Sequence, residues 1–171
     1  MKKIYLINFY KEKKEKKIEK YEKFLKDILK GDEFLFIINE GEKIESPDFI
    51  ILSGSQKMVG DGEVDLNYLN YIFSHQKPTL GICYGHQAMS LFFGSKVQKA
   101  EREHKGFEKI KLLEKSLIFR DFPENFEMYE SHFEEVLETE EFLKDFKIVA
   151  KSEEGGIEGV ESKNFPFFGV Q

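Results

Sequence analysis

The stretch PTLGICYGHQAMSLFF, residues 78–93, contains Cys83, the only cysteine of the 171-residue sequence. The apolar residues that precede the cysteine are typical of a strand, and those that follow it favour a helix. A strand that turns directly into a helix at Cys83 places the thiol on a tight bend at the carboxyl end of the strand. Gly81 and Gly85 lack the side chains that would collide across such a bend. The stretch therefore predicts an α/β fold with a reactive residue at the edge of its sheet.

Outward from this bend, apolar runs of strand length alternate with helical patterns. Strands are expected at 3–9, 33–38, 48–52 and 78–83, and helices at 11–30, 64–73 and from Tyr84 to about Phe93. Apolar strands interleaved with helices predict a mainly parallel sheet covered on both faces. After Gly94 the runs are shorter and predict strands and hairpins, with one short helix around Glu140–Asp145.

The lysine-rich segment 11–30 has two interpretations, a basic arm or the outer face of a packed helix. Its apolar residues recur at spacings of three and four, which predicts one buried stripe: Ile18, Tyr21, Phe24, Leu25, Ile28 and Leu29. The net charge is −6, so the summed field does not attract a nucleic-acid backbone. The packed helix is the favoured interpretation, and no nucleic-acid partner is expected.

Length and composition predict one domain over residues 1–171. A single cysteine forms no internal disulfide, which fits a reducing compartment. Nowhere do about 18 apolar residues follow one another, so no membrane partner is expected. A cytoplasmic location is the resulting expectation.

Cys83 has two interpretations. Free cysteine is often a small buried residue at a strand end. A helix N-terminus, however, supplies a partial positive charge and free N–H groups, and both favour the thiolate. The glycines on either side repeat the geometry of the G-x-S-x-G elbow of serine hydrolases, which favours a nucleophile.

Four segments together resemble class I glutamine amidotransferases, and most closely their GMP synthetase glutaminase branch. They are GICYGHQ (81–87), DFIILSGS (48–55), YESHFEEV (129–136) and FPFFGVQ (165–171). The resemblance implies a flavodoxin-like fold, with a mainly parallel central sheet flanked by helices and a small mixed sheet. It also implies attack of a cysteine thiolate on L-glutamine, release of ammonia to a synthetase partner, and no cofactor.

The resemblance also implies residue roles. Cys83 would be the nucleophile. The backbone N–H groups of Tyr84 and of Ser55, the residue after Gly54, would form the oxyanion hole. Gln87 and the backbone of Ser131 and His132 would hold the substrate glutamine.

The sequence departs from the family pattern at two places. Ser55 stands where the family has a second glycine. The family's last strand continues as G-V-Q-F-H-P-E, with a histidine base and its orienting glutamate, whereas the sequence stops at Gln171. Either the 171 residues are part of a longer protein that lacks its C-terminal segment and last helix here, or they form a catalytically impaired relative.

Neither the histidines nor the Gly-rich turn gives a further site. His86 is expected to pack at the helix start, and it or His132 is a lesser candidate for the base. His75 ends a helix and His104 lies in the charged stretch AEREHKG, so both are expected at the surface, with no metal site. GDG at 60–62 lacks the lysine and spacing of a phosphate loop and predicts a turn.

Three functions remain open at this stage. The first is a glutamine amidotransferase domain that releases ammonia for a synthetase. The second is a stand-alone hydrolase of γ-glutamyl amides that uses the same thiol. The third is a noncatalytic relative that binds a ligand or a partner.

Overall fold

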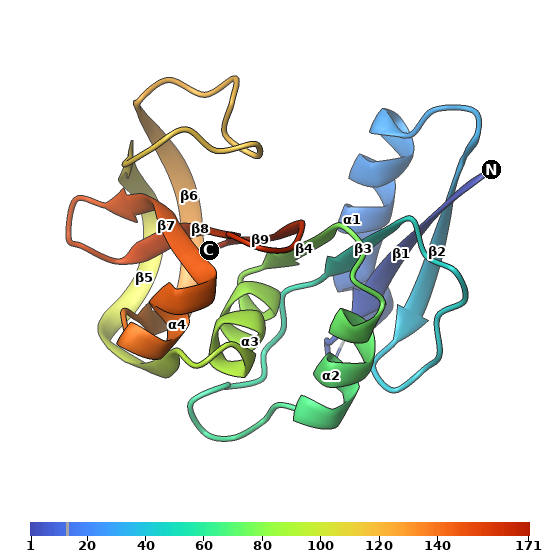
Figure 1. Ribbon diagram of the computed structural model, residues 1–171, viewed down its shortest axis with the longest axis horizontal. Coiled ribbons are helices and arrows are strands. Elements are labelled where there is room, and N and C mark those ends of the chain that lie inside the picture. Colours follow the sequence, from blue (N-terminus) through green and yellow to red (C-terminus); the bar gives the residue numbers. More distant parts are fainter. Residues whose placement is uncertain (13) are drawn as a thin grey trace.

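The computed structural model describes residues 1–12 and 14–171 (Figure 1). The elements of the first half are β1 (Lys2–Asn8), α1 (Lys14–Ile28), β2 (Glu33–Asn39), β3 (Phe49–Leu52), α2 (Leu66–Ser74), β4 (Thr79–Ile82) and α3 (Tyr84–Phe92). Those of the second half are β5 (Lys96–Leu112), β6 (Asn125–Leu137), α4 (Glu140–Asp145), β7 (Phe146–Ser152), β8 (Ile157–Ser162) and β9 (Phe167–Val170).

The strands of the described residues form one continuous sheet in the order β2-β1-β3-β4-β9-β8-β7-β5-β6. From β2 to β9 all neighbours are parallel, as the alternation of strands and helices predicts. From β9 to β6 all neighbours are antiparallel. The strands expected as a small mixed sheet therefore continue the central sheet through β9 and β8, and the α/β fold is confirmed.

Strands β5 and β6 form a long antiparallel ribbon at one end of this sheet. The sequence predicts several short strands here, but β5 runs for 17 residues and β6 for 13. Many of their residues are exposed and charged, so no continuous apolar run marks either strand. The ribbon brings residues 104 and 132 directly opposite each other.

Helices cover both faces of the parallel part of the sheet (Figure 1). Alternate residues of the central strands point to opposite faces. Ile4 and Leu6 of β1 pack with α1, whereas Tyr5 and Ile7 of the same strand join the larger core against α2 and α3. The sheet is thus buried on both sides where β4 leads into α3.

Helix α1 buries a narrower stripe than its sequence predicts. Ile18 and Leu25 are buried in the smaller core. Phe24 and Ile28, in contrast, are 64% and 55% exposed. The helix also covers residues 14–28 rather than 11–30; residue 13 lies outside the described residues.

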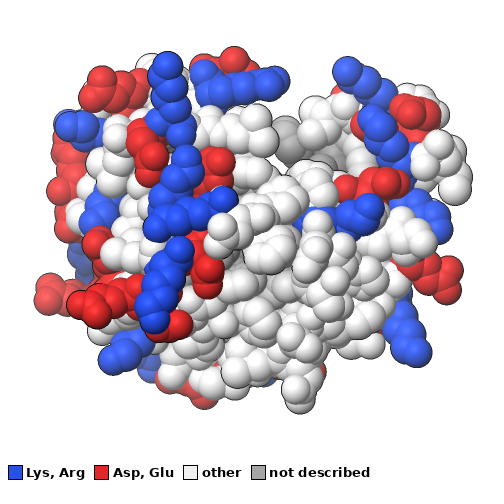
Figure 2. Space-filling model, in the orientation of Figure 1, with Lys and Arg blue, Asp and Glu red and all other residues white. Residues whose placement is uncertain are grey.

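Charged side chains are unevenly spread over the face drawn in Figure 2. They gather over the antiparallel strands and over α1, and leave the middle of this face largely uncharged. Among the described residues, no helix combines the length and the apolar character needed to cross a membrane.

Candidate active site

The backbone bends sharply at Cys83, between the end of β4 and the start of α3. Cys83 has φ 51° and ψ −105°, a conformation that side-chain-bearing residues rarely adopt. Its N–H donates to the Val170 carbonyl at 2.8 Å, and its own carbonyl accepts from the Gln87 N–H at 2.9 Å. The predicted bend is therefore confirmed, and neighbouring strand and helix hydrogen bonds hold it in place.

The glycines on either side of Cys83 sit where a side chain has no room. A Cβ on Gly81 would lie 2.6 Å from the carbonyl carbon of Gly85. A Cβ on Gly85 would lie 2.4 Å from the carbonyl oxygen of Leu52, in β3. Both contacts are with backbone, which moves only if strand and helix separate. The predicted reason for the two glycines is confirmed.

The surroundings of the Cys83 thiol favour its protonated form. Burial raises the pKa of the Cys83 thiol above its ordinary value, and the carboxylates of Glu130 and Glu134 add to this increase. The Tyr84 N–H and the side-chain amide of Gln171 act in the opposite direction and lower the pKa. The N–H group at the start of α3 thus favours the thiolate, as expected, but burial has the larger effect and the pKa of the thiol is raised overall.

The candidate oxyanion-hole residues lie on two segments that meet at Cys83. Tyr84 follows the cysteine at the N-terminus of α3, and its N–H interacts with the thiol. Gly54 and Ser55 follow β3 and line the same cavity as Cys83. Ser55 does not have a positive φ, so a serine is accommodated where the family has glycine. The Gly54 N–H donates to the Tyr21 hydroxyl at 3.1 Å.

A cavity of about 560 Å³ opens beside the thiol. The candidate substrate-binding residues Gln87, Ser131 and His132 all line it. The Gln87 side-chain amide donates to the carbonyl of Glu134 at 3.0 Å and to Oε1 of Gln171 at 3.1 Å. The structure thus brings the candidate site residues together around one cavity, which all of them line except Tyr84, the residue next to Cys83.

Three further residues that line this cavity are not predicted as site residues from the sequence. The buried carboxylate of Glu134 accepts the N–H groups of Val59 and Gly60, each at 2.7 Å. It therefore ties the segment after Ser55 to β6. Gln171, directly after β9, lines the cavity beside the thiol, and the Tyr21 hydroxyl of α1 accepts from the Gly54 N–H. Since these residues come from segments that are distant in the sequence, no local sequence pattern predicts that they meet.

The structure confirms some of the predictions for the remaining histidines and contradicts others. His86 is fully buried in α3, as expected for packing. His75 follows α2 as predicted, but its Nε2 atom is buried rather than at the surface. His104 does not lie in a solvated loop: it is part of β5, and its side chain is 12% exposed. The surface prediction for His104 is wrong because this residue pairs with His132 of β6, and the two rings stack. Residues 60–62 form a turn, as predicted.

A family model described as "Glutamine amidotransferase class-I" matches residues 9–171. The chain belongs to this family. Curated amidotransferase relatives include a glutamine-hydrolysing GMP synthase subunit of Pyrococcus abyssi, with 36% identity over 77% of this chain and 68% of the relative. The corresponding protein of Methanocaldococcus jannaschii is 34% identical over 71% of this chain and 61% of the relative. The matches thus span about two thirds of the length of these relatives.

Solved structures agree with the family assignment. A Thermoplasma acidophilum protein described as a GMP synthase subunit superposes with a TM-score of 0.82 and 26% identity, covering 100% of this amidotransferase chain and 83% of its own. A glutamine amidotransferase from Thermotoga maritima has a TM-score of 0.75 at 20% identity, covering 99% and 74%. The second comparison supports the fold alone.

Proposed function

We propose that residues 1–171 form a single amidotransferase domain that hydrolyses the side-chain amide of L-glutamine through Cys83. One observation carries the proposal: a cysteine with φ 51° projects from the β4–α3 bend into a cavity lined by Gly54, Ser55 and Gln87. Family membership and the named activity of the glutamine-hydrolysing relatives support it.

The proposed reaction has two halves. The sulfur attacks the amide carbon, the C–N bond breaks, and the thiol proton leaves with the nitrogen as ammonia. Water then attacks the γ-glutamyl thioester, which releases glutamate and returns the proton to sulfur. The N–H groups of Tyr84 and Ser55 would stabilise the oxyanion in both halves. Since the pKa of Cys83 is raised, a base that accepts the thiol proton is required.

The ammonia acceptor in this proposal is a synthetase subunit. The support is that relatives are named as one subunit of a GMP synthase, which implies a second. Copurification of a larger chain with this protein from its own cells tests the partnership. A stand-alone γ-glutamyl amide hydrolase would instead purify by itself and release ammonia without a partner.

Ammonia release from glutamine tests the activity, measured with the purified chain alone and in the presence of the synthetase partner. Cys83→Ala is expected to abolish release, because no other thiol exists in the sequence. Ser74→Ala, at the end of α2, is the matched control and should keep the activity of the parent chain. Equal ammonia release by Cys83→Ala would exclude the thioester route.

A noncatalytic binding role is the second candidate, and the raised pKa of the Cys83 thiol favours it. A glutamine analogue with an alkylating diazoketone in its side chain separates the two roles. Covalent labelling of Cys83, detected by mass spectrometry and blocked by excess glutamine, supports the enzyme. Glutamine binding by calorimetry without any labelling, even with the synthetase partner present, supports the binding role.

A further inference from the structure

A second cluster of polar side chains lies on the β5–β6 ribbon. His104 of β5 and His132 of β6 are direct cross-strand partners. Their rings stack with centroids 4.7 Å apart and planes inclined by 4°. One potential ligand atom each from His104, His132 and Glu130 lies within 4.8 Å of the others. Two imidazoles and a carboxylate thus place one potential ligand atom each in a small volume.

The ring of His132 is oriented like that of a metal ligand. Its Nδ1 lies 2.8 Å from the carbonyl oxygen of Glu134. A carbonyl only accepts, so the proton must be on Nδ1. In the neutral ring Nε2 then carries a lone pair, and it points at Oε2 of Glu130 at 3.1 Å. Metal-binding histidines typically donate their second N–H to such a carbonyl.

A further carboxylate, from a different strand, lines the same cavity as His104 and His132. Glu158 of β8 is 7% exposed, and its Oε2 atom is buried without a hydrogen-bond partner among the described residues. An unpartnered buried carboxylate oxygen is costly. A cation bound beside this oxygen would give it the partner that it lacks among the described residues.

We propose that His104, Glu130 and His132 bind a divalent first-row transition-metal ion such as Zn²⁺, with Glu158 as the fourth ligand. Imidazole nitrogen and carboxylate oxygen form a ligand set that suits this class of ion. Ligand atoms about 2.1 Å from a tetrahedral ion lie about 3.4 Å from one another. The separation of 3.1 Å between His132 Nε2 and Glu130 Oε2 is already close to that value.

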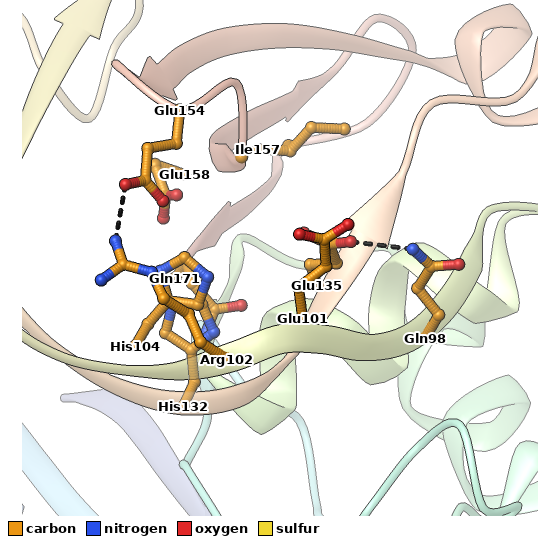
Figure 3. Close-up of a pocket in the computed structure, with 11 residues that line it drawn as sticks. Gln98, Glu101, Arg102, His104, His132, Glu135, Glu154, Ile157, Glu158 and Gln171 are labelled. Atoms are coloured by element: carbon orange, nitrogen blue, oxygen red, sulfur yellow. Dashed lines mark hydrogen bonds and ion pairs between the residues drawn. The ribbon is translucent and has the colours of Figure 1, made fainter.

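His104, His132 and Glu158 line a cavity of about 510 Å³ that gives solvent access to the cluster. Figure 3 shows the stacked rings of His104 and His132 in this cavity, with Glu158 above them in the view. The guanidinium of Arg102 also lines the cavity, but it pairs with Glu154 at 2.6 Å and with Glu108 at 3.7 Å. Its positive charge is therefore compensated by carboxylates outside the cluster.

The ion would lie between the two cavities, because Glu130 lines the glutamine cavity whereas His104 and Glu158 line the other. His132 lines both cavities, and the backbone of Ser131 and His132 belongs to the proposed substrate site. A bound ion would link the β5–β6 ribbon to β8 and hold this backbone in place. The proposal does not depend on Cys83, so it can be tested without measuring catalysis.

Titration of the full chain, first stripped with a chelator, tests the site. Zn²⁺ binding by calorimetry should saturate at one ion per chain. Co²⁺ should give visible absorption bands of a four-coordinate ion. His104→Gln and Glu130→Gln should each weaken Zn²⁺ binding roughly tenfold or more, because each removes a ligand.

Two variants that keep the cluster intact serve as controls. His75→Gln removes a histidine outside the cluster, and Glu101→Gln removes a carboxylate that lines the same cavity. Both should bind Zn²⁺ like the parent chain. Circular dichroism of the metal-free variants shows that each is folded. Absence of saturable binding in the folded parent chain, or unchanged affinity in folded His104→Gln and Glu130→Gln, would overturn the proposal.

Discussion

Cys83 holds a backbone conformation that typically costs about 1–3 kcal/mol for a residue with a side chain. Its neighbours compensate for this cost. The N–H and the carbonyl of Cys83 are both paired, one with β9 and one with α3. Gly81 and Gly85 let β3, β4 and α3 approach closely enough for these pairs to form. The position of the thiol therefore depends in part on Gly81 and Gly85, which do not line the cavity.

Gly85→Ala should destabilise the fold. The new Cβ would lie 2.4 Å from the carbonyl oxygen of Leu52, so α3 must move away from β3. We expect a loss of about 1–3 kcal/mol in the free energy of unfolding, the usual cost of overpacking, measured with urea. Gly31→Ala is the control, because nothing lies within 4 Å of its Cβ position. Equal stability of the two variants would contradict the steric argument.

The raised pKa of Cys83 has a direct kinetic consequence. Only the thiolate reacts with iodoacetamide. The rate of alkylation of the 171-residue chain should therefore be lower than that of a free cysteine peptide near neutral pH, and should still increase above the ordinary pKa of 9.0. Mass spectrometry across a pH series measures both rates. A rate that levels off below the peptide's pKa would show that the helix N-terminus dominates after all.

At the scale of elements, Glu134 joins the segment after β3 to strand β6. Glu134→Gln replaces a carboxylate that accepts two N–H groups with an amide that has one acceptor oxygen. We expect a loss of about 1.5–3 kcal/mol in the free energy of unfolding, because hydrogen bonds to charged groups are strong. Amide hydrogen exchange at Val59 and Gly60 should become faster.

Glu135→Gln is the matched control for this prediction. Glu135 is the next residue of β6, and its carboxylate accepts a hydrogen bond from Gln98 near the surface. The control should leave the exchange of the Val59 and Gly60 amides unchanged. Slower or unchanged exchange in Glu134→Gln would show that other contacts hold this segment.

The sequence predicts some of these elements well and others poorly, for physical reasons. Strands β1, β3 and β4 are largely buried between the layers of helices, so their sequences are apolar runs that predict strands. Strand β5 is mostly exposed and charged, and its length follows from pairing with β6. The bend at Cys83 is predictable because its glycines are local. The cluster of His104, Glu130 and His132 is not, because cross-strand register assembles it.

For the molecule as a whole, β8 and β9 connect a parallel and an antiparallel half of one sheet. Glu158 of β8 contributes a buried carboxylate beside the ribbon of β5 and β6. A buried ionisable group at such a junction links global stability to pH, since its protonation differs between the folded and unfolded chain.

The metal-free protein should lose stability as pH increases. The pKa of Glu158 is about 8 in the fold, against 4.5 ordinarily, and the pKa of His132 is also raised, so the fold binds these protons more tightly than the unfolded chain. Their stabilisation is present at low pH and is lost as pH rises through the folded values. Urea unfolding with chelator present measures this change. Between about pH 5 and pH 8, the free energy of unfolding of Glu158→Gln should increase relative to that of the parent chain by up to about 4 kcal/mol. Glu153→Gln, which removes an exposed carboxylate, should follow the parent profile, and a parent-like slope in Glu158→Gln would refute the assignment.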